Sequence, residues 1–183
     1  MKKIFFILFL TASSINIMAD SGKNIFQKEF NMYKLTPLNN FLFLAPPLIW
    51  NIAFASKLPL DHFSQEAPTW ILVTQGIFRI SINVYPLLLP IDSKHKFFLP
   101  GLTVYSVGLL LYFSSWTILM TNPESNLAKN PIMQFAPAYL PLIWLIGISI
   151  MSKSVIYPIL STGFIGFHVA EYVFRYNIIE VNF

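Results

Sequence analysis

The chain has 183 residues, of which 55% are hydrophobic and only 11% are charged. Soluble domains carry roughly 25% charged residues, so this composition argues against a soluble domain. The apolar residues fall in blocks about 20 residues long, which is the length of a helix that crosses about 30 Å of hydrocarbon. The blocks are continuous rather than alternating, which favours helices over strands. The sequence therefore predicts an all-α membrane protein.

The formal net charge is +4, and the chain has no cysteine. The basic residues are scattered singly along the predicted loops, where they suit contact with lipid headgroups and control of topology. We therefore expect the lipid bilayer, and no nucleic acid, as a partner. The absence of cysteine excludes disulfides, thiol catalysis and thiolate metal sites.

Residues 1–19 predict an N-terminal signal peptide, because two lysines precede a short apolar run and a small, polar stretch that ends at Ala19. An uncleaved anchor is the alternative, since Ile17 is large for a position three residues before the cleavage point. Residues 20–37 alternate apolar and charged side chains. They predict a polar or amphipathic segment on the membrane surface, with a solvated linker as the alternative.

Residues 38–176 predict a single transmembrane bundle, followed by a short tail over residues 177–183. The loops are short and polar, and leave no room for a soluble domain. Prolines in or at the ends of most spans predict kinks. The five predicted spans are residues 38–56, 69–90, 99–121, 135–152 and 154–174.

Two arguments about orientation disagree. Five spans place the two ends of the bundle on opposite sides, and the side of residues 20–37 carries more lysines than the other. The positive-inside rule makes that side cytoplasmic, whereas a signal peptide makes it extracytoplasmic. We give priority to the signal peptide, because the first targeting segment usually dominates. Together these features predict a multi-pass protein of a bacterial inner membrane.

A polar stripe runs along the second span. Arg79 lies about ten residues from either end of this span, and Gln75 and Asn83 lie one turn away on the same face. An arginine at the bilayer centre costs roughly 2.5–3.5 kcal/mol, so such residues face the bundle interior, pair, or line a pathway.

A second stripe lies in the fifth span, where His168, Glu171 and Arg175 are spaced by three and four residues. Counting depth at about 1.5 Å per residue brings Glu171 within reach of Arg79. We therefore predict an intramembrane polar cluster of Arg79, Gln75, Asn83, His168 and Glu171. The alternative is a local role, in which Glu171 pairs with Arg175 one turn later and His168 donates to a backbone carbonyl.

Four further residues could line an aromatic, partly polar pocket: Asn51, Tyr105, Tyr112 and Trp116. Ordinary packing and interface anchoring explain such residues equally well. We predict no metal centre, because the only other histidines, His62 and His95, lie in loops on opposite sides. No cofactor is predicted either, since a single intramembrane histidine is too little for a haem site.

Three function classes follow. The first is a non-enzymatic accessory or assembly protein, whose intramembrane charges pair internally or with another membrane subunit. The second is a small transporter or binding protein, in which Arg79 holds an anion and Glu171 or His168 passes protons. The third is a lipid-directed enzyme that uses His168 and Glu171. The sequence contains no phosphate-binding glycine loop, nucleophile elbow or zinc motif, so we favour the first class.

The orientation is testable with a tag at Phe183. If the signal peptide sets the topology, the tag lies on the cytoplasmic side and is inaccessible to a membrane-impermeant reagent in intact cells. Labelling of intact cells at this tag would instead support the orientation that the lysines favour.

Overall fold

The computed structural model describes residues 29, 31–57 and 66–175. Every regular element in this part of the chain is a helix, which confirms the predicted all-helical fold. The elements in chain order are η1 Asn40–Leu44, α3 Ala45–Phe54, η2 Ala55–Lys57, α4 Thr69–Val84, η4 Tyr85–Leu88, α5 Phe98–Thr121, α6 Pro131–Gln134, α7 Ala136–Tyr139, α8 Pro141–Ser152 and α9 Ile156–Arg175.

These helices lie close to the five predicted spans. The first predicted span corresponds to α3 with a 3-10 turn at each end, the second to α4 continued by η4, and the third to α5. The fourth corresponds to α7 and α8, with α6 just before it, and the fifth to α9. Two stretches, Thr69–Leu88 and Phe98–Thr121, are long and apolar enough to cross a membrane, and Ala136–Ser152 is a shorter apolar stretch.

Prolines mark the interruptions of the helices. Pro46 and Pro86 lie in the first turns of α3 and η4, and Pro137 and Pro141 lie in the first turns of α7 and α8. A proline lacks the amide hydrogen that an inner helical position needs, but the first turn has no intrahelical acceptor for that hydrogen. The fourth span is therefore a series of short helices rather than one kinked helix.

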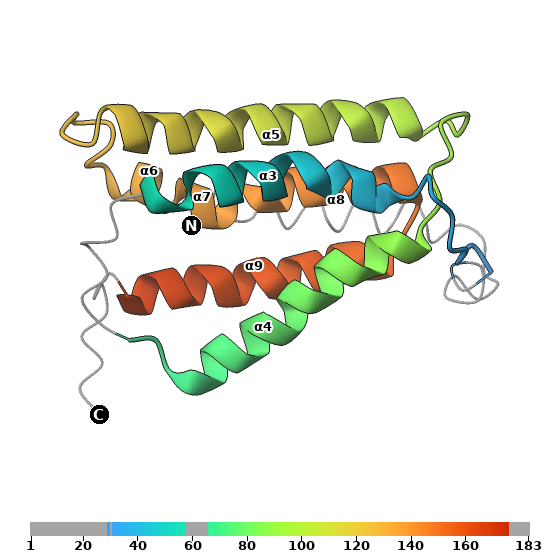
Figure 1. Ribbon diagram of the computed structural model, residues 1–183, viewed down its shortest axis with the longest axis horizontal. Coiled ribbons are helices and arrows are strands. Elements are labelled where there is room, and N and C mark those ends of the chain that lie inside the picture. Colours follow the sequence, from blue (N-terminus) through green and yellow to red (C-terminus); the bar gives the residue numbers. More distant parts are fainter. Residues whose placement is uncertain (1–28, 30, 58–65, 176–183) are drawn as a thin grey trace, which may run out of the picture.

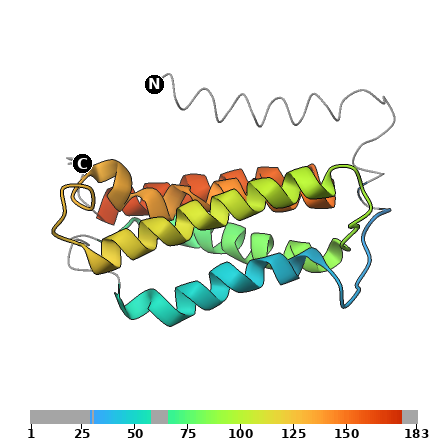
Figure 2. The same ribbon diagram turned by 90° about the horizontal axis from the view of Figure 1, so that it is seen from above.

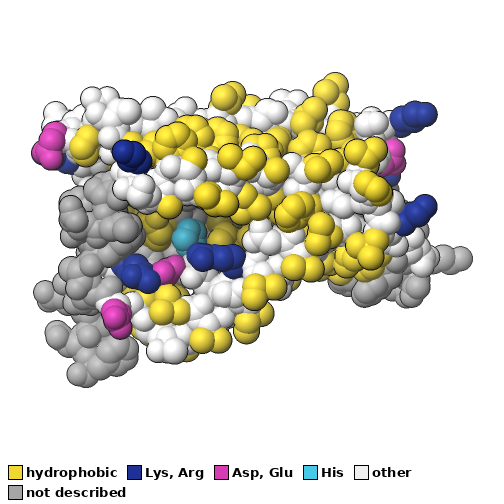
Figure 3. Space-filling view, in the orientation of Figure 1, with side chains coloured by type: hydrophobic (Ala, Val, Ile, Leu, Met, Phe, Trp, Pro, Cys, Tyr) yellow, Lys and Arg dark blue, Asp and Glu magenta, His cyan; other side chains and the backbone are white. Residues whose placement is uncertain are grey.

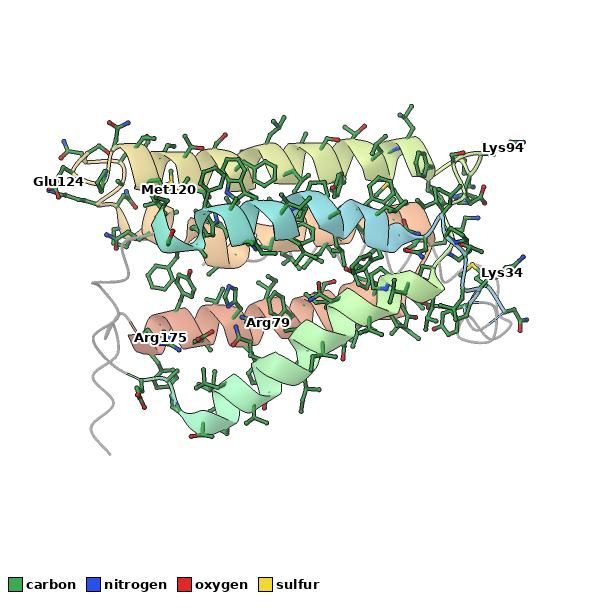
Figure 4. The ribbon with its side chains drawn as sticks, viewed as in Figure 1. Lys34, Arg79, Lys94, Met120, Glu124 and Arg175 are labelled. Carbon is green, nitrogen blue, oxygen red and sulfur yellow. The ribbon has the colours of Figure 1, made fainter. Side chains whose placement is uncertain are left out.

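The long helices run roughly along one axis (Figure 1). Figure 1 shows α5 at the top and α4 at the bottom of the molecule, and the view from above shows α3 along the face opposite α9 (Figure 2). Figure 4 places Lys34 and Lys94 at one end of the bundle and Glu124 at the other.

An ion pair joins two loops at the first of these ends. The Nζ atom of Lys153 donates to the Asp92 carboxylate at 3.0 Å, and this hydrogen bond lowers the pKa of Asp92. Lys153 adopts a left-handed conformation with φ of 58° and ends α8, so the chain turns directly into α9.

Helices α5 and α8 are in the closest contact of the bundle, because glycines lie where the two backbones meet. A Cβ atom added to Gly147 would lie 2.4 Å from the backbone nitrogen of Tyr105, and one added to Gly108 would lie 2.6 Å from that of Trp144. Only a residue without a side chain allows this approach. The buried core around it includes Leu44, Ile82, Tyr105, Tyr112, Trp116, Trp144, Leu145, Ile148, Met151 and Tyr157.

Helix α4 packs on α9 through aromatic side chains. The Phe78 ring lies against Gly163 and stacks on Phe167, with ring centroids 5.7 Å apart. Toward the start of α9, the Tyr157 hydroxyl donates to the carbonyl of Ile82 at 3.0 Å. These contacts fix which faces of α4 and α9 meet, and so determine the position of the polar stripes.

Large apolar side chains also point outward. Ile52 is 81% exposed, Ile80 is 67% exposed and Leu110 is 66% exposed. Figure 3 shows hydrophobic side chains across the middle of one face, with several charged side chains at its two ends. An apolar belt of this kind suits the hydrocarbon of a bilayer better than water.

The glycine contact between α5 and α8 predicts the effect of a methyl group. Gly147→Ala should lower the free energy of unfolding by about 1–3 kcal/mol, because the added carbon overlaps the backbone at Tyr105. Thermal unfolding in detergent measures this loss. Gly166→Ala is the control, since nothing lies within 4 Å of its added carbon. Equal stability of the two variants would contradict the close packing.

Candidate functional site

The first polar site is a buried carboxylate at the start of α9. Glu29 is 1% exposed, although it precedes the first predicted span by nine residues. Its Oε2 atom accepts from the backbone amides of Val155 at 3.0 Å and Ile156 at 3.2 Å. The Ser154 hydroxyl donates to Oε1 and accepts from the amide of Tyr157. A negative charge here satisfies amides that have no acceptor within the helix and complements the helix dipole.

Two tyrosines extend this site toward the end of α4. The Tyr85 hydroxyl donates to Oε1 of Glu29 at 2.6 Å and hydrogen-bonds to the hydroxyl of Tyr33. The Tyr85 ring stacks on that of Tyr157, with centroids 6.1 Å apart. Partial burial raises the pKa of Tyr33, so this hydroxyl keeps its proton at neutral pH. The site therefore joins the segment before α3, the end of α4 and the start of α9.

The second polar site lies between α4 and α9. Gln75, which is buried, hydrogen-bonds through Nε2 to Nδ1 of His168 at 2.6 Å. The donor and acceptor roles in this contact depend on the tautomer of His168, because its Nδ1 atom also lies near Oε2 of Glu171. The His168 ring is held between Phe164, on which it stacks, and the edge-on ring of Tyr172.

Glu171 connects this histidine to the end of α9. Its carboxylate lies 3.6 Å from Nδ1 of His168 and accepts from Nε of Arg175 at 2.9 Å. The Glu171 side chain is 13% exposed, and both of these partners lie on its own helix. Glu171 is therefore neutralised locally, as the alternative sequence interpretation expected.

Arg79 lies apart from this carboxylate. Figure 4 places it near the middle of the bundle, away from the end that carries Glu124. Its side chain is exposed, and its guanidinium carbon lies 5.8 Å from the centroid of the Phe164 ring. Within residues 29, 31–57 and 66–175 it forms no ion pair. The Asn83 amide donates to the backbone carbonyl of Arg79 at 2.7 Å. This hydrogen bond therefore does not involve the guanidinium group.

The structure thus brings together only part of the predicted cluster. Gln75, His168 and Glu171 are in contact, Arg79 borders them through Phe164, and Asn83 bonds within its own helix. The space-filling view shows a recess on this face, with a histidine beside basic and acidic side chains (Figure 3).

The four residues predicted to line a pocket belong to the packed interior. The Tyr112 hydroxyl donates to Oδ1 of Asn51 at 2.5 Å, and the Tyr105 hydroxyl donates to the carbonyl of Phe43 at 2.7 Å. Trp116 meets the Tyr112 ring edge-on at 6.1 Å. These contacts tie α3 to α5, and they give the four residues a packing role.

Sequence reasoning missed Glu29 as part of any site. It placed residues 20–37 on the membrane surface, and no spacing rule links Glu29 to Ser154, 125 residues later. The local sequence indicated only the role of Ser154, because a serine just before an apolar helical run is a typical N-cap.

Comparisons with protein-family models, with curated proteins and with solved structures find no match for the chain.

The contacts of Glu29 predict that replacing its carboxylate by an amide destabilises the fold. Glu29→Gln should lower the free energy of unfolding by about 1–3 kcal/mol, since it removes the charge that accepts from the α9 amides and leaves a poorly matched buried amide. Thermal unfolding in detergent measures the loss. Glu124→Gln is the matched control, because the exposed Glu124–Lys129 pair contributes at most about 1 kcal/mol. If the two variants behave alike, the carboxylate does not hold α9.

Proposed function

We propose that all five helical segments cross a membrane, and that the protein is a multi-pass protein of a bacterial inner membrane. The two long apolar helices support this proposal directly. The outward-facing Ile52, Ile80 and Leu110 support it as well, because apolar side chains of this size rarely cover a soluble surface so widely. Helix α9 carries its charged groups in its C-terminal half, and Arg175 at its end lies within reach of headgroups.

Within that membrane, the protein acts as a non-enzymatic accessory or assembly protein. This proposal rests on which of the charged side chains in the helices are already paired within the chain. Glu171 is engaged with Arg175 and His168, and His168 is hydrogen-bonded to Gln75, so neither is available as a general base without breaking its contacts. Arg79 is the exposed charged residue within α4, and it has no acidic partner in the described part of the chain.

A small-anion binding or transport protein is the second candidate. The recess in Figure 3 favours it, because two basic side chains and a histidine lie there around one acidic side chain. In this alternative, Arg79 holds the anion and His168 exchanges protons. A lipid-directed enzyme receives no comparable support, since Glu171 is held by Arg175 and His168 is held by Gln75.

Two substitutions separate these roles. Arg79→Gln should lower the stability of the purified chain by no more than about 0.5–1 kcal/mol, because it loses an exposed cation–π contact with Phe164 and no ion pair. His168→Ala should lower it by about 1–3 kcal/mol, because it leaves the buried Gln75 amide without its hydrogen-bond partner. Thermal unfolding in detergent compares the two. A strongly destabilised Arg79→Gln variant would show that Arg79 is internally paired.

Membrane insertion is tested separately. The chain should stay in the membrane pellet after extraction with alkaline carbonate, and should leave it only in detergent. Release by carbonate would contradict the five-span proposal. Purification in mild detergent then distinguishes the candidates, because an accessory protein should retain a stoichiometric subunit that Arg79→Gln loses, whereas a transporter should not.

A further inference from the structure

The guanidinium group of Arg79 has five N–H donors. In the described part of the chain, this group lies over the face of the Phe164 ring and forms no ion pair. An arginine in hydrocarbon without an acceptor is costly, and the ring supplies neither a full negative charge nor a hydrogen-bond acceptor for each donor. The contact with Phe164 therefore leaves Arg79 without a negatively charged partner and without acceptors for most of its N–H groups.

No described acid in the chain can meet this requirement. Glu29 is enclosed by the start of α9, and Glu171 is held by Arg175. Asp92 and Glu124 pair with lysines in loops, and Glu66 lies before the start of α4. Because these acids are either engaged or outside the middle of the bundle, a second copy of the chain does not offer a free described carboxylate at the depth of Arg79.

The face around Arg79 is shaped for another helix. Leu72, Gly76, Arg79 and Asn83 follow one another at intervals of four, three and four residues, so they form one seam along α4. Nothing lies within 4 Å of a Cβ atom added to Gly76, so this seam is open to an approaching backbone. Glycine at such a position is typical of close helix contacts in membranes.

Depth distinguishes a helix from a lipid as the occupant. Arg79 lies about ten residues from the start of α4, which is about 15 Å along the axis and close to the centre of a bilayer. Lipid phosphates lie at the surface, beyond the length of an arginine side chain from that depth. A carboxylate on a membrane helix can lie at any depth, and it can accept two parallel hydrogen bonds from the guanidinium group.

We propose that the seam of Leu72, Gly76, Arg79 and Asn83 binds a membrane helix of a different protein that carries an Asp or Glu side chain at mid-membrane depth. This inference rests on the proposed function and specifies the partner. It assigns to Arg79 the role of recognising the acid, and to Gly76 the role of allowing the helix to approach.

The test uses the full chain in vesicles of a zwitterionic lipid. The probe is a synthetic Leu/Ala transmembrane peptide of about 21 residues with one Glu at its centre, and its matched control has Gln there. Because the chain has no cysteine, Ser93→Cys gives a single labelling position for a fluorescent donor in an exposed loop. Energy transfer to an acceptor on the peptide reports binding.

We expect the Glu peptide to bind about tenfold more tightly than the Gln peptide, as a charge-assisted hydrogen bond allows. Arg79→Gln should abolish the difference, and Arg79→Lys should retain part of it. Gly76→Leu should weaken both peptides by closing the seam, whereas Gly166→Leu on α9 should not, since both added side chains enter open space. Circular dichroism confirms that each variant is folded.

Three outcomes would overturn the proposal: equal binding of the Glu and Gln peptides, an unchanged preference in Arg79→Gln, or binding that Gly76→Leu leaves intact. Loss of the preference on adding anionic lipid alone would assign Arg79 to a lipid phosphate and would also overturn it. Failure of the five-span proposal is recognised independently, because the chain would then be released from the vesicles by carbonate.

Discussion

The Glu29 carboxylate at the start of α9 is the contact on which the rest of the arrangement depends. It accepts from two backbone amides of α9, from Ser154 and from Tyr85 at the end of α4. Helix α9 is therefore fixed at its first turn against α4. With its start held there, the far half of α9 turns His168 toward Gln75 and leaves Glu171 beside Arg175.

The need to satisfy each buried polar group also explains the two polar sites of the bundle, one at Glu29 and one at His168. In an apolar environment each polar group needs a partner supplied by the protein, because water is not present to replace it. At the level of Glu29, helix amides and hydroxyl groups satisfy the carboxylate. At the level of His168, Gln75 from α4 hydrogen-bonds to the histidine ring, and Arg175 from α9 pairs with the Glu171 carboxylate. Arg79 lies between these levels and receives only an aromatic face.

Helices α5 and α8 form the other rigid part of the molecule. Their close approach depends on Gly108 and Gly147, and the aromatic residues around them tie α3 to the same unit through the Tyr112–Asn51 hydrogen bond. The aromatic residues therefore act through packing, while the chemistry available to a partner is concentrated on α4.

The sequence by itself predicted the approximate positions of the helices, because apolar length and proline position are local properties of the chain. It did not predict that residues 135–152 form the separate helices α7 and α8. It also placed Gln75, Arg79 and Asn83 on neighbouring turns, and His168, Glu171 and Arg175 on another stripe, since helical periodicity follows from spacing alone. Only the tertiary structure decided which of these groups meet. The rotation of each helix about its own axis is set by side-chain packing such as Phe78 against Gly163, which no local spacing encodes. For that reason Gln75 rather than Arg79 faces His168, and Glu29 reaches a helix that begins more than a hundred residues later.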